Sequence, residues 1–186
     1  MSRLTQHTSE TAPPESLPFI ERSLANNGFI PNLIATLAGA PEALEAYLTV
    51  GELNSRSRLS LAEREAVQLT AAAIHGCSFC AAGHAAVALK KAKLPLEVVV
   101  ALQSAGSTGD ARLDAVATFT RDVIAARGAV SDDSYRAFLG AGFDERHALD
   151  VVLGVSLATL CNFANNLGQP AINPELLPYR AGVLGQ

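Results

Sequence analysis

The sequence has no tryptophan, a single methionine and few aromatic residues, which make up 5% of its 186 positions. Charged residues account for only 17%, and no segment alternates apolar and polar residues as half-buried strands do. Alanine-rich segments separated by glycine, proline and asparagine dominate instead. Because alanine has the highest helix propensity and the length suits one domain, the composition predicts a single all-α domain.

Positive charge is also scarce. The chain has 14 Lys and Arg against 18 Asp and Glu, which gives a formal net charge of −4. Its densest basic segment, KKAK at 90–93, lies where a helix is expected to end, a position that favours positive charge on any helix. Proteins that bind nucleic acids cluster positive charge to neutralise phosphates, so we expect no nucleic-acid partner.

Long hydrophobic segments and an export signal are missing as well. Residues 1–19 have no apolar core of the kind that signal peptides carry. The longest apolar segment runs from Val151 to Cys161 and is shorter than the ~20 residues that a membrane-spanning helix needs. Cysteine occurs three times, an odd number that argues against the disulfide framework of a secreted protein. These features predict a cytoplasmic protein without a membrane partner.

Capping and helix-breaking residues divide the chain into eight to ten helices. Residues 1–14 are polar and predict a flexible N-terminal arm, followed by one all-α domain over residues 15–186. The expected helices cover about 15–26, a short segment after 31, 42–54, 61–74, 78–91, 95–104, 110–127, 131–139 and 144–166. The phenylalanines expected in the core are Phe79, Phe119, Phe138 and Phe163.

Two of these helices are predicted to form a hairpin. Ser60 and Glu63 have the spacing of a capping box, which starts a helix at residue 61. Gly76 suits the position after its last turn, and the next helix begins at Cys77 or Ser78. The turn between the two helices is therefore very short.

The segment GCSFCAAGH at residues 76–84 carries the candidate chemistry. On a helix Cys77, Cys80 and His84 lie along one stripe. Thiols three apart in a first helical turn come within disulfide reach, and the helix N-terminus favours the thiolate form. The pattern suits a redox dithiol, a zinc site, or two small buried side chains without chemistry.

Folding the hairpin back places Glu65 level with residues 84–87, and hence near His84. A carboxylate, an imidazole and two thiols then gather between two helices. The carboxylate would orient the histidine, which takes the thiol proton directly or through water. The same set would bind zinc if Glu65 or His75 supplied a further ligand.

The frame E-x11-C-x2-C-x3-H, inside an alanine-rich hairpin, resembles the AhpD-like branch of the carboxymuconolactone decarboxylase family. The resemblance implies an all-α fold, a homo-oligomer (trimer or hexamer), and reduction of a hydroperoxide without metal or cofactor. It implies that Cys80 attacks the peroxide, that Cys77 resolves the product as a disulfide, and that His84 and Glu65 relay the proton. An external dithiol or disulfide reductant would then restore the thiols.

One position departs from the family pattern. The alkylhydroperoxidases have a histidine directly before the second cysteine, where this chain has Phe79. Outside the frame, Cys161 is expected to be a core thiol. Three amides near it are expected to line a pocket or an interface, namely Asn162, Asn165 and Asn166.

The sequence thus predicts a cytoplasmic antioxidant peroxidase with a dithiol/disulfide cycle. Two alternatives remain open at this point. The first is a thiol-disulfide oxidoreductase whose substrate is itself a disulfide. The second is a non-catalytic, oligomeric helical protein that binds zinc or a small ligand at the Cys/Cys/His site.

Overall fold

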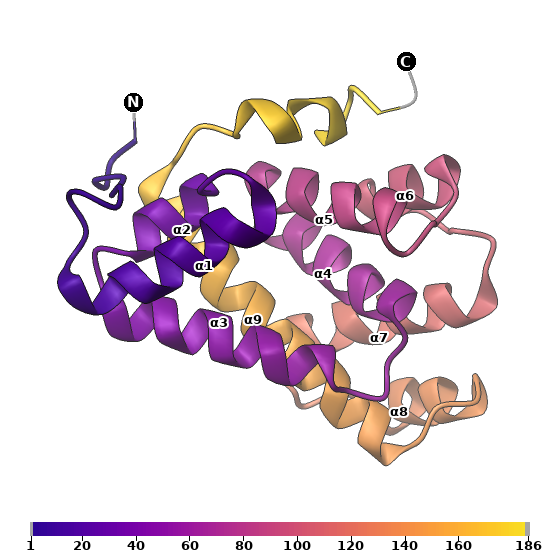
Figure 1. Ribbon diagram of the computed structural model, residues 1–186. Coiled ribbons are helices and arrows are strands. Elements are labelled where there is room, and N and C mark those ends of the chain that lie inside the picture. The colour runs from indigo at the N-terminus through magenta and orange to yellow at the C-terminus, as the bar shows by residue number, and fades with distance from the viewer. Residues whose placement is uncertain (1, 185–186) are drawn as a thin grey trace.

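The computed structural model describes residues 2–184, and in that range the chain folds into nine α-helices and two short 3₁₀ helices, without strands (Figure 1). This confirms the all-α prediction. Met1 and residues 185–186, which the predicted arm and domain include, lie outside the described residues. The helices are α1 (Leu17–Asn27), α2 (Asn32–Leu37), α3 (Pro41–Ser55), α4 (Leu61–His75), α5 (Ser78–Lys90), α6 (Leu96–Gln103), α7 (Ala111–Ala125), α8 (Asp132–Gly140) and α9 (Glu145–Gly168), with 3₁₀ helices η1 (Pro14–Ser16) and η2 (Pro174–Tyr179).

The α4–α5 hairpin forms as the sequence predicts. Ser60 and Glu63 make both hydrogen bonds of the capping box at the start of α4. Gly76 follows α4 with a φ of +67°, a left-handed conformation that glycine adopts without steric cost. Cys77 is the N-cap of α5, so one residue in the turn and one cap separate the two helices.

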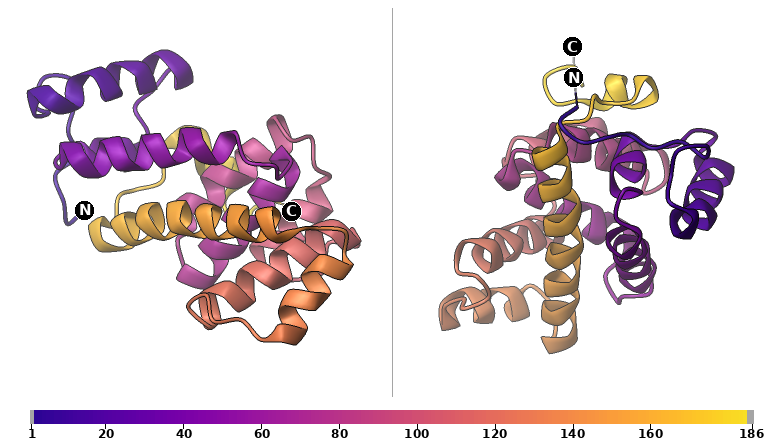
Figure 2. Two further views of the ribbon diagram at one scale, coloured as in Figure 1. Left: turned by 90° about the horizontal axis from the view of Figure 1, so that it is seen from below. Right: turned by 90° about the vertical axis from the view of Figure 1, so that its left-hand side faces the viewer.

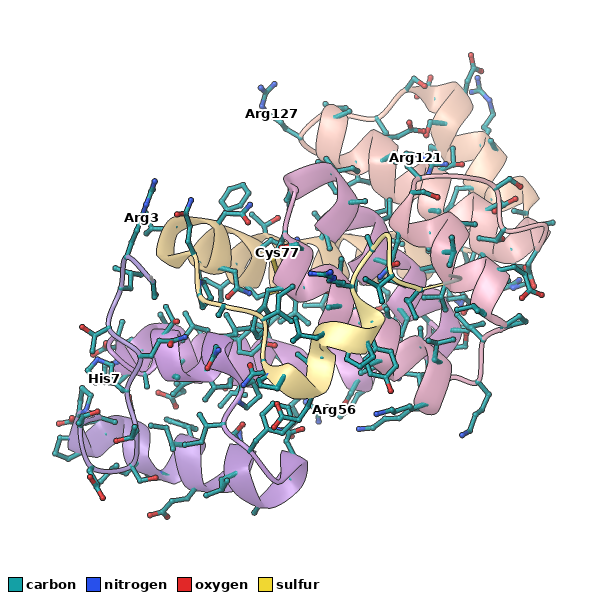
Figure 3. The ribbon with its side chains drawn as sticks, turned by 90° about the horizontal axis from the view of Figure 1, so that it is seen from above. Arg3, His7, Arg56, Cys77, Arg121 and Arg127 are labelled. Carbon is teal, nitrogen blue, oxygen red and sulfur yellow. A yellow bond between two sulfur atoms is a disulfide. The ribbon has the colours of Figure 1, made fainter. Side chains whose placement is uncertain are left out.

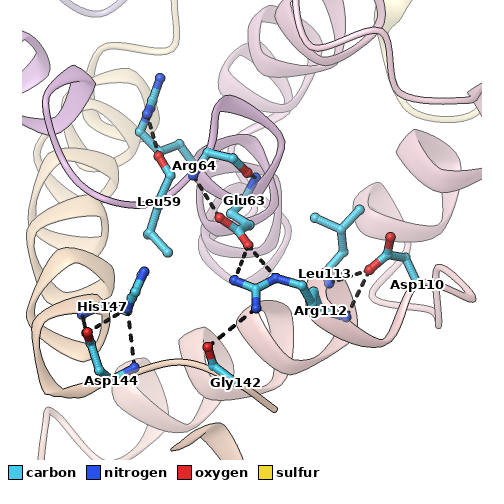
Figure 4. A network of polar contacts seen from close by, with 10 residues as sticks. Leu59, Glu63, Arg64, Asp110, Arg112, Leu113, Gly142, Asp144 and His147 are labelled. Carbon is cyan, nitrogen blue, oxygen red and sulfur yellow. Dashed lines mark hydrogen bonds and ion pairs between the residues drawn. The ribbon is translucent and has the colours of Figure 1, made fainter.

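Glu63 also connects the hairpin to the second half of the chain (Figure 4). Its carboxylate accepts hydrogen bonds from the Arg112 guanidinium of α7 at 2.8 and 3.0 Å. Partial burial opposes ionisation of Glu63, but the bonds from the Ser60 backbone and from Arg112 outweigh it and lower the pKa of the carboxyl. Arg112 in turn donates to the carbonyl of Gly142 before α9. The start of α4 is thereby connected to α7 and, through Arg112, to the segment between α8 and α9.

The long helix α9 stands between the two halves of the molecule. Figure 2 shows α1–α3 on one side of it and α4–α8 on the other, and α9 packs against α2, α3, α4, α5 and α7. Gly154 allows the closest approach to α4, because a Cβ at this position would lie 2.9 Å from Val67 Cγ1. The buried side chains form two clusters, and the cluster between α9 and α1–α3 contains both residues of the cysteine pair, Cys77 and Cys80.

The length of α9 corrects one conclusion from the sequence. The helix has 24 residues and an 18-residue window of mean hydropathy 1.5, so it is long enough and apolar enough to cross a membrane. The statement that no segment is long enough is therefore wrong, because the helix extends well beyond the apolar segment that ends at Cys161. Core helices also meet this criterion, and α9 has helices packed along it, so the finding is weak evidence for a membrane span.

Phe163 is a second correction. Phe79, Phe119 and Phe138 are buried as expected, but Phe163 is 57% exposed. Its ring packs against that of His75 at the end of α4, with the two ring centroids 5.0 Å apart in a T-shaped arrangement. A phenylalanine is expected to be buried, but the packing of other helices around α9 decides which face of α9 is covered.

The N-terminal segment follows its own domain rather than extending away from it (Figure 3). The amide of Arg3 donates to the carbonyl of Gly168 at 2.7 Å, and the amide of His7 donates to that of Ala35 at 2.9 Å. The last residue of the predicted arm, Pro14, already belongs to η1. The segment thus contacts the end of α9 and α2. Its flexibility stays a prediction.

The close contact at Gly154 predicts a specific loss of stability. In Gly154→Ala the new methyl group overlaps Val67, and moving α9 away from α4 should cost about 1–3 kcal/mol of unfolding free energy. The better helix propensity of alanine offsets up to about 1 kcal/mol of that loss. Urea denaturation measures the net change, which we expect to be destabilising.

Gly51→Ala is the matched control, because Gly51 lies inside α3 and its added Cβ meets nothing within 4 Å. This variant should gain about 0.5–1 kcal/mol from propensity alone. Equal stabilisation of both variants would contradict the proposed close packing of α9 on α4.

Candidate redox site

Cys77 and Cys80 form a disulfide at the start of α5, with their Cα atoms 5.4 Å apart (Figure 3). Both residues are buried. As N-cap of α5, Cys77 accepts a hydrogen bond at its Sγ from the backbone N–H of Cys80, at 3.2 Å. The free amides of a helix N-terminus stabilise negative charge, so the local structure favours thiolates once the pair is reduced.

Glu65 and His84 come together across the hairpin, as the sequence predicts. The Glu65 carboxylate contacts His84 Nδ1 at 2.8 Å. Glu65 is only 6% exposed and would be costly to bury without this partner. Because Nδ1 is engaged with the carboxylate, Nε2 is the ring nitrogen left to exchange a proton with a bound molecule. Their catalytic role remains a proposal.

Three amides of α9 hold the hairpin turn. Asn166 Nδ2 donates to the carbonyl of His75 at 2.6 Å, and Asn162 Nδ2 lies 3.1 Å from His75 Nδ1. Asn165 Nδ2 donates to the sulfur of Cys80 at 3.1 Å, while its buried Oδ1 has no partner within the described residues. The i, i+3, i+4 spacing of the three amides is visible in the sequence. The contact between one of them and a cysteine sulfur is not.

A cavity of about 400 Å³ opens on Cys80; we call it the apolar pocket. Side chains of α1, α2, α3 and α5 line it, among them Phe19, Leu33 and Leu48. His84 also borders the cavity, which places the imidazole and one sulfur on the same wall. Pockets of this size and composition are typical of small-molecule sites.

A second hollow, of about 390 Å³, borders Cys77 instead; we call it the polar hollow. Its lining includes Ser78, Asn166 and Gln169. Phe79 borders both cavities and is 6% exposed. Each sulfur of the pair therefore faces a different cavity, an arrangement that sequence spacing alone does not show.

Two further side chains border the apolar pocket. Burial raises the pKa of the Tyr47 phenol, with the neighbouring Cys161 and Glu65 adding to the shift, so the O–H stays available as a donor at neutral pH. Tyr47 was not predicted as a site residue, because no pattern in the sequence of its helix sets it apart from a core tyrosine. Burial raises the pKa of Cys161 to about 12, and its thiol donates to the Ala158 carbonyl at 3.3 Å. A thiol so strongly protonated is a poor nucleophile, which agrees with a core role.

The zinc alternative gains no support from this geometry. Among residues 2–184, no three side chains of His, Cys, Asp or Glu gather in a way that would hold a metal ion. The imidazole of His75, one of the considered ligands, is instead engaged with Asn162 of α9.

The part of the chain that carries this site is similar to a known protein family. Residues 41–122, which include Glu65, Cys77, Cys80 and His84, match the carboxymuconolactone decarboxylase family. None of the curated proteins matches the sequence.

Solved structures share the fold over almost the whole chain. A peroxidase-related protein from Ralstonia eutropha JMP134 with an alkylhydroperoxidase AhpD core has a TM-score of 0.86 at 23% identity, over 100% of this chain and 98% of its own. A peroxidase-related protein from Silicibacter sp. TM1040 has a TM-score of 0.81 at 20% identity, over 94% and 93%. A variant of the debrominase Bmp8, in complex with 2,3,4-tribromopyrrole, has a TM-score of 0.76 at 15% identity, over 94% and 93%. At these identities the likeness concerns the fold alone.

The contact between His75 and α9 predicts a pH dependence of stability. Burial lowers the pKa of His75 from its usual 6.5 in the folded protein. As the pH falls through 6.5, the unfolded chain therefore takes up the proton before the folded one does, and the unfolding free energy decreases. Above that pH both states hold the neutral ring and this contribution is constant.

We expect urea denaturation to show a loss of stability from pH 7 to pH 5 that is smaller in His75→Gln than in the parent chain. The amide of glutamine retains an acceptor for Asn162 but does not titrate. An equal loss in both proteins would show that His75 contributes nothing to the pH dependence.

Proposed function

Residues 41–122 form a domain of the carboxymuconolactone decarboxylase family within an AhpD-like fold, and on this premise we propose that the chain is a thiol-dependent peroxidase that reduces hydroperoxides through Cys77 and Cys80. The observation that carries the proposal is the arrangement around one sulfur. Cys80 lies in a small-molecule pocket beside the Glu65–His84 pair and accepts a hydrogen bond from Asn165.

In the oxidative half of the cycle the Cys80 thiolate attacks the terminal oxygen of the hydroperoxide. An S–O bond forms, the O–O bond breaks, and the alcohol leaves with a proton. His84 supplies that proton after taking it from the Cys80 thiol, and Glu65 holds the ring and balances its charge. Cys77 then attacks the sulfenic acid, which forms the disulfide and releases water.

The reductive half is proposed to use the other side of the site. A thiolate of an external dithiol enters the polar hollow and attacks Cys77 Sγ, and Cys80 leaves as a thiolate. The sulfur that leaves faster is the one whose thiolate is better stabilised, and Asn165 donates to Cys80. The second thiol of the reductant then releases Cys77, so two electrons pass from the dithiol to the peroxide.

Phe79 gives this division a physical basis. This residue borders both the apolar pocket and the polar hollow, at the position where the resembling alkylhydroperoxidases have a histidine. Peroxide and reductant would approach from opposite sides without displacing each other.

The proposal extends to the setting of the enzyme. A reducing compartment such as the cytoplasm would supply the dithiol, and an antioxidant role follows from peroxide removal. A homo-oligomer, as a trimer or hexamer, is part of the same proposal. Large apolar side chains of α9 that are 45–70% exposed offer it a contact surface, namely Leu149, Val152, Phe163 and Leu167.

The likeness to a debrominase means that the reaction must be tested rather than assumed from the fold. A reactive thiol beside an apolar pocket would also suit a halogenated aromatic substrate. Parallel assays of bromide release from tribromopyrrole and of hydroperoxide consumption separate the two. Bromide release far outpacing peroxide consumption would replace the proposal.

One equivalent of hydroperoxide should consume two thiols of the reduced protein and lower its intact mass by about 2 Da, as expected for one disulfide. Cys80→Ser should lose turnover. Cys77→Ser should still react once with peroxide and then stop as the sulfenic acid, a gain of about 16 Da. Full turnover in Cys80→Ser would reject the assigned roles.

Asn165→Leu should destabilise the Cys80 thiolate relative to the thiol, because the thiolate loses its side-chain donor. The rate constant for peroxide, measured by stopped flow on reduced protein, should fall at pH 7 and recover at higher pH. Asn54→Leu is the matched control, since Asn54 is also a buried amide with an unpartnered oxygen but lies outside the site. A pH profile shifted equally in both variants would show that Asn165 acts on stability alone.

A further inference from the structure

The entrance of the apolar pocket carries only positive charge. Arg22 of α1 and the lysines that end α5, Lys90 and Lys91, line the cavity, and no Asp or Glu does so among residues 2–184. This concentration runs against the composition, because acidic residues outnumber basic ones and the net charge is −4. The positive charge near the pocket is therefore a local feature.

These cations are not neutralised by carboxylates of the described chain. None of the three forms an ion pair within residues 2–184. The Lys90 ammonium instead lies over the ring of Tyr179 at 4.7 Å, and the Arg22 guanidinium lies over the ring of Phe19 at 5.8 Å. Aromatic faces hold both side chains near the cavity while leaving their charge uncompensated.

Along α5 the lining changes from reactive side chains to charged ones. Cys80 lies in the first turn of α5 and Lys90 ends the helix, about 15 Å away by helical rise. Phe19, Leu33 and Leu48 supply apolar lining. A ligand that matches this order has an anionic group at one end, an apolar body, and its reactive group at the other end. A cavity of about 400 Å³ is also far larger than hydrogen peroxide requires.

We propose that the apolar pocket binds anionic amphipathic molecules, and that the hydroperoxide reduced at Cys80 is an organic one with a carboxylate or other anionic group remote from its O–O bond. The part that concerns the hydroperoxide rests on the proposed peroxidase function. The binding part does not, because a carboxylate of the same shape without an O–O bond would occupy the same pocket.

Binding is tested with decanoate and its neutral counterpart decanamide, by isothermal titration calorimetry of the oxidised protein. Decanoate should bind about 3- to 10-fold more tightly, as expected for an anion near partly exposed cations, and the difference should shrink as salt is added. The double variant Arg22→Gln/Lys91→Gln should abolish most of the difference.

A matched control removes two positive charges elsewhere. Arg121 and Arg127 lie in and just after α7, away from α1 (Figure 3), and neither lines the pocket. Arg121→Gln/Arg127→Gln should keep the preference for decanoate. Loss of the preference in this control as well would show that net charge alone, and not the pocket entrance, attracts the anion.

Catalysis is tested with a hydroperoxy fatty acid and its methyl ester, which differ only in charge. The acid should have the higher kcat/KM, and Arg22→Gln/Lys91→Gln should reduce that preference. If acid and ester react equally and decanoate binds no better than decanamide, the inference is overturned while the peroxidase proposal stands. If neither hydroperoxide reacts but decanoate binds preferentially, the peroxidase proposal fails and the anion pocket remains.

Discussion

The site depends on the hydrogen bonds that side chains of α9 make to the α4–α5 turn. A turn this short leaves polar groups at the helix ends without partners, and in a buried position such groups cost free energy unless another element supplies the bonds. The amides of Asn162, Asn165 and Asn166 supply them to His75 and to the Cys80 sulfur. The position of the two sulfurs is therefore set by a helix that begins at Glu145, far along the chain from Cys80.

This arrangement also explains why the site has two sides. The start of α5 is held against α9, so one sulfur faces α1–α3 while the other faces the end of α9 and the residues after it. Phe79 borders both cavities. A buried carboxylate, Glu65, is tolerated because it meets the imidazole of the facing helix. Protonation chemistry and sulfur chemistry are thus brought together by the same hairpin.

Features that depend on local spacing were predictable from the sequence. The capping box at Ser60 and Glu63 and the glycine after α4 define the hairpin, and a hairpin with helical rise places Glu65 opposite His84. Features that depend on packing between distant segments of the chain were not predictable from the sequence. Phe163 was expected in the core and is exposed, and the sequence did not show that the N-terminal segment hydrogen-bonds to residues of α2 and α9.

By itself, the sequence determined the all-α class, the hairpin and the family frame, because helix propensity, capping and i, i+3, i+4 spacing act over a few residues. Only the tertiary structure decided that Asn165 reaches Cys80, that the two sulfurs open into different cavities, and that cations of α1 and α5 share one entrance. Each of these joins segments far apart in the chain. Their contacts follow from how whole helices pack, and the pattern within any one helix is compatible with several such packings.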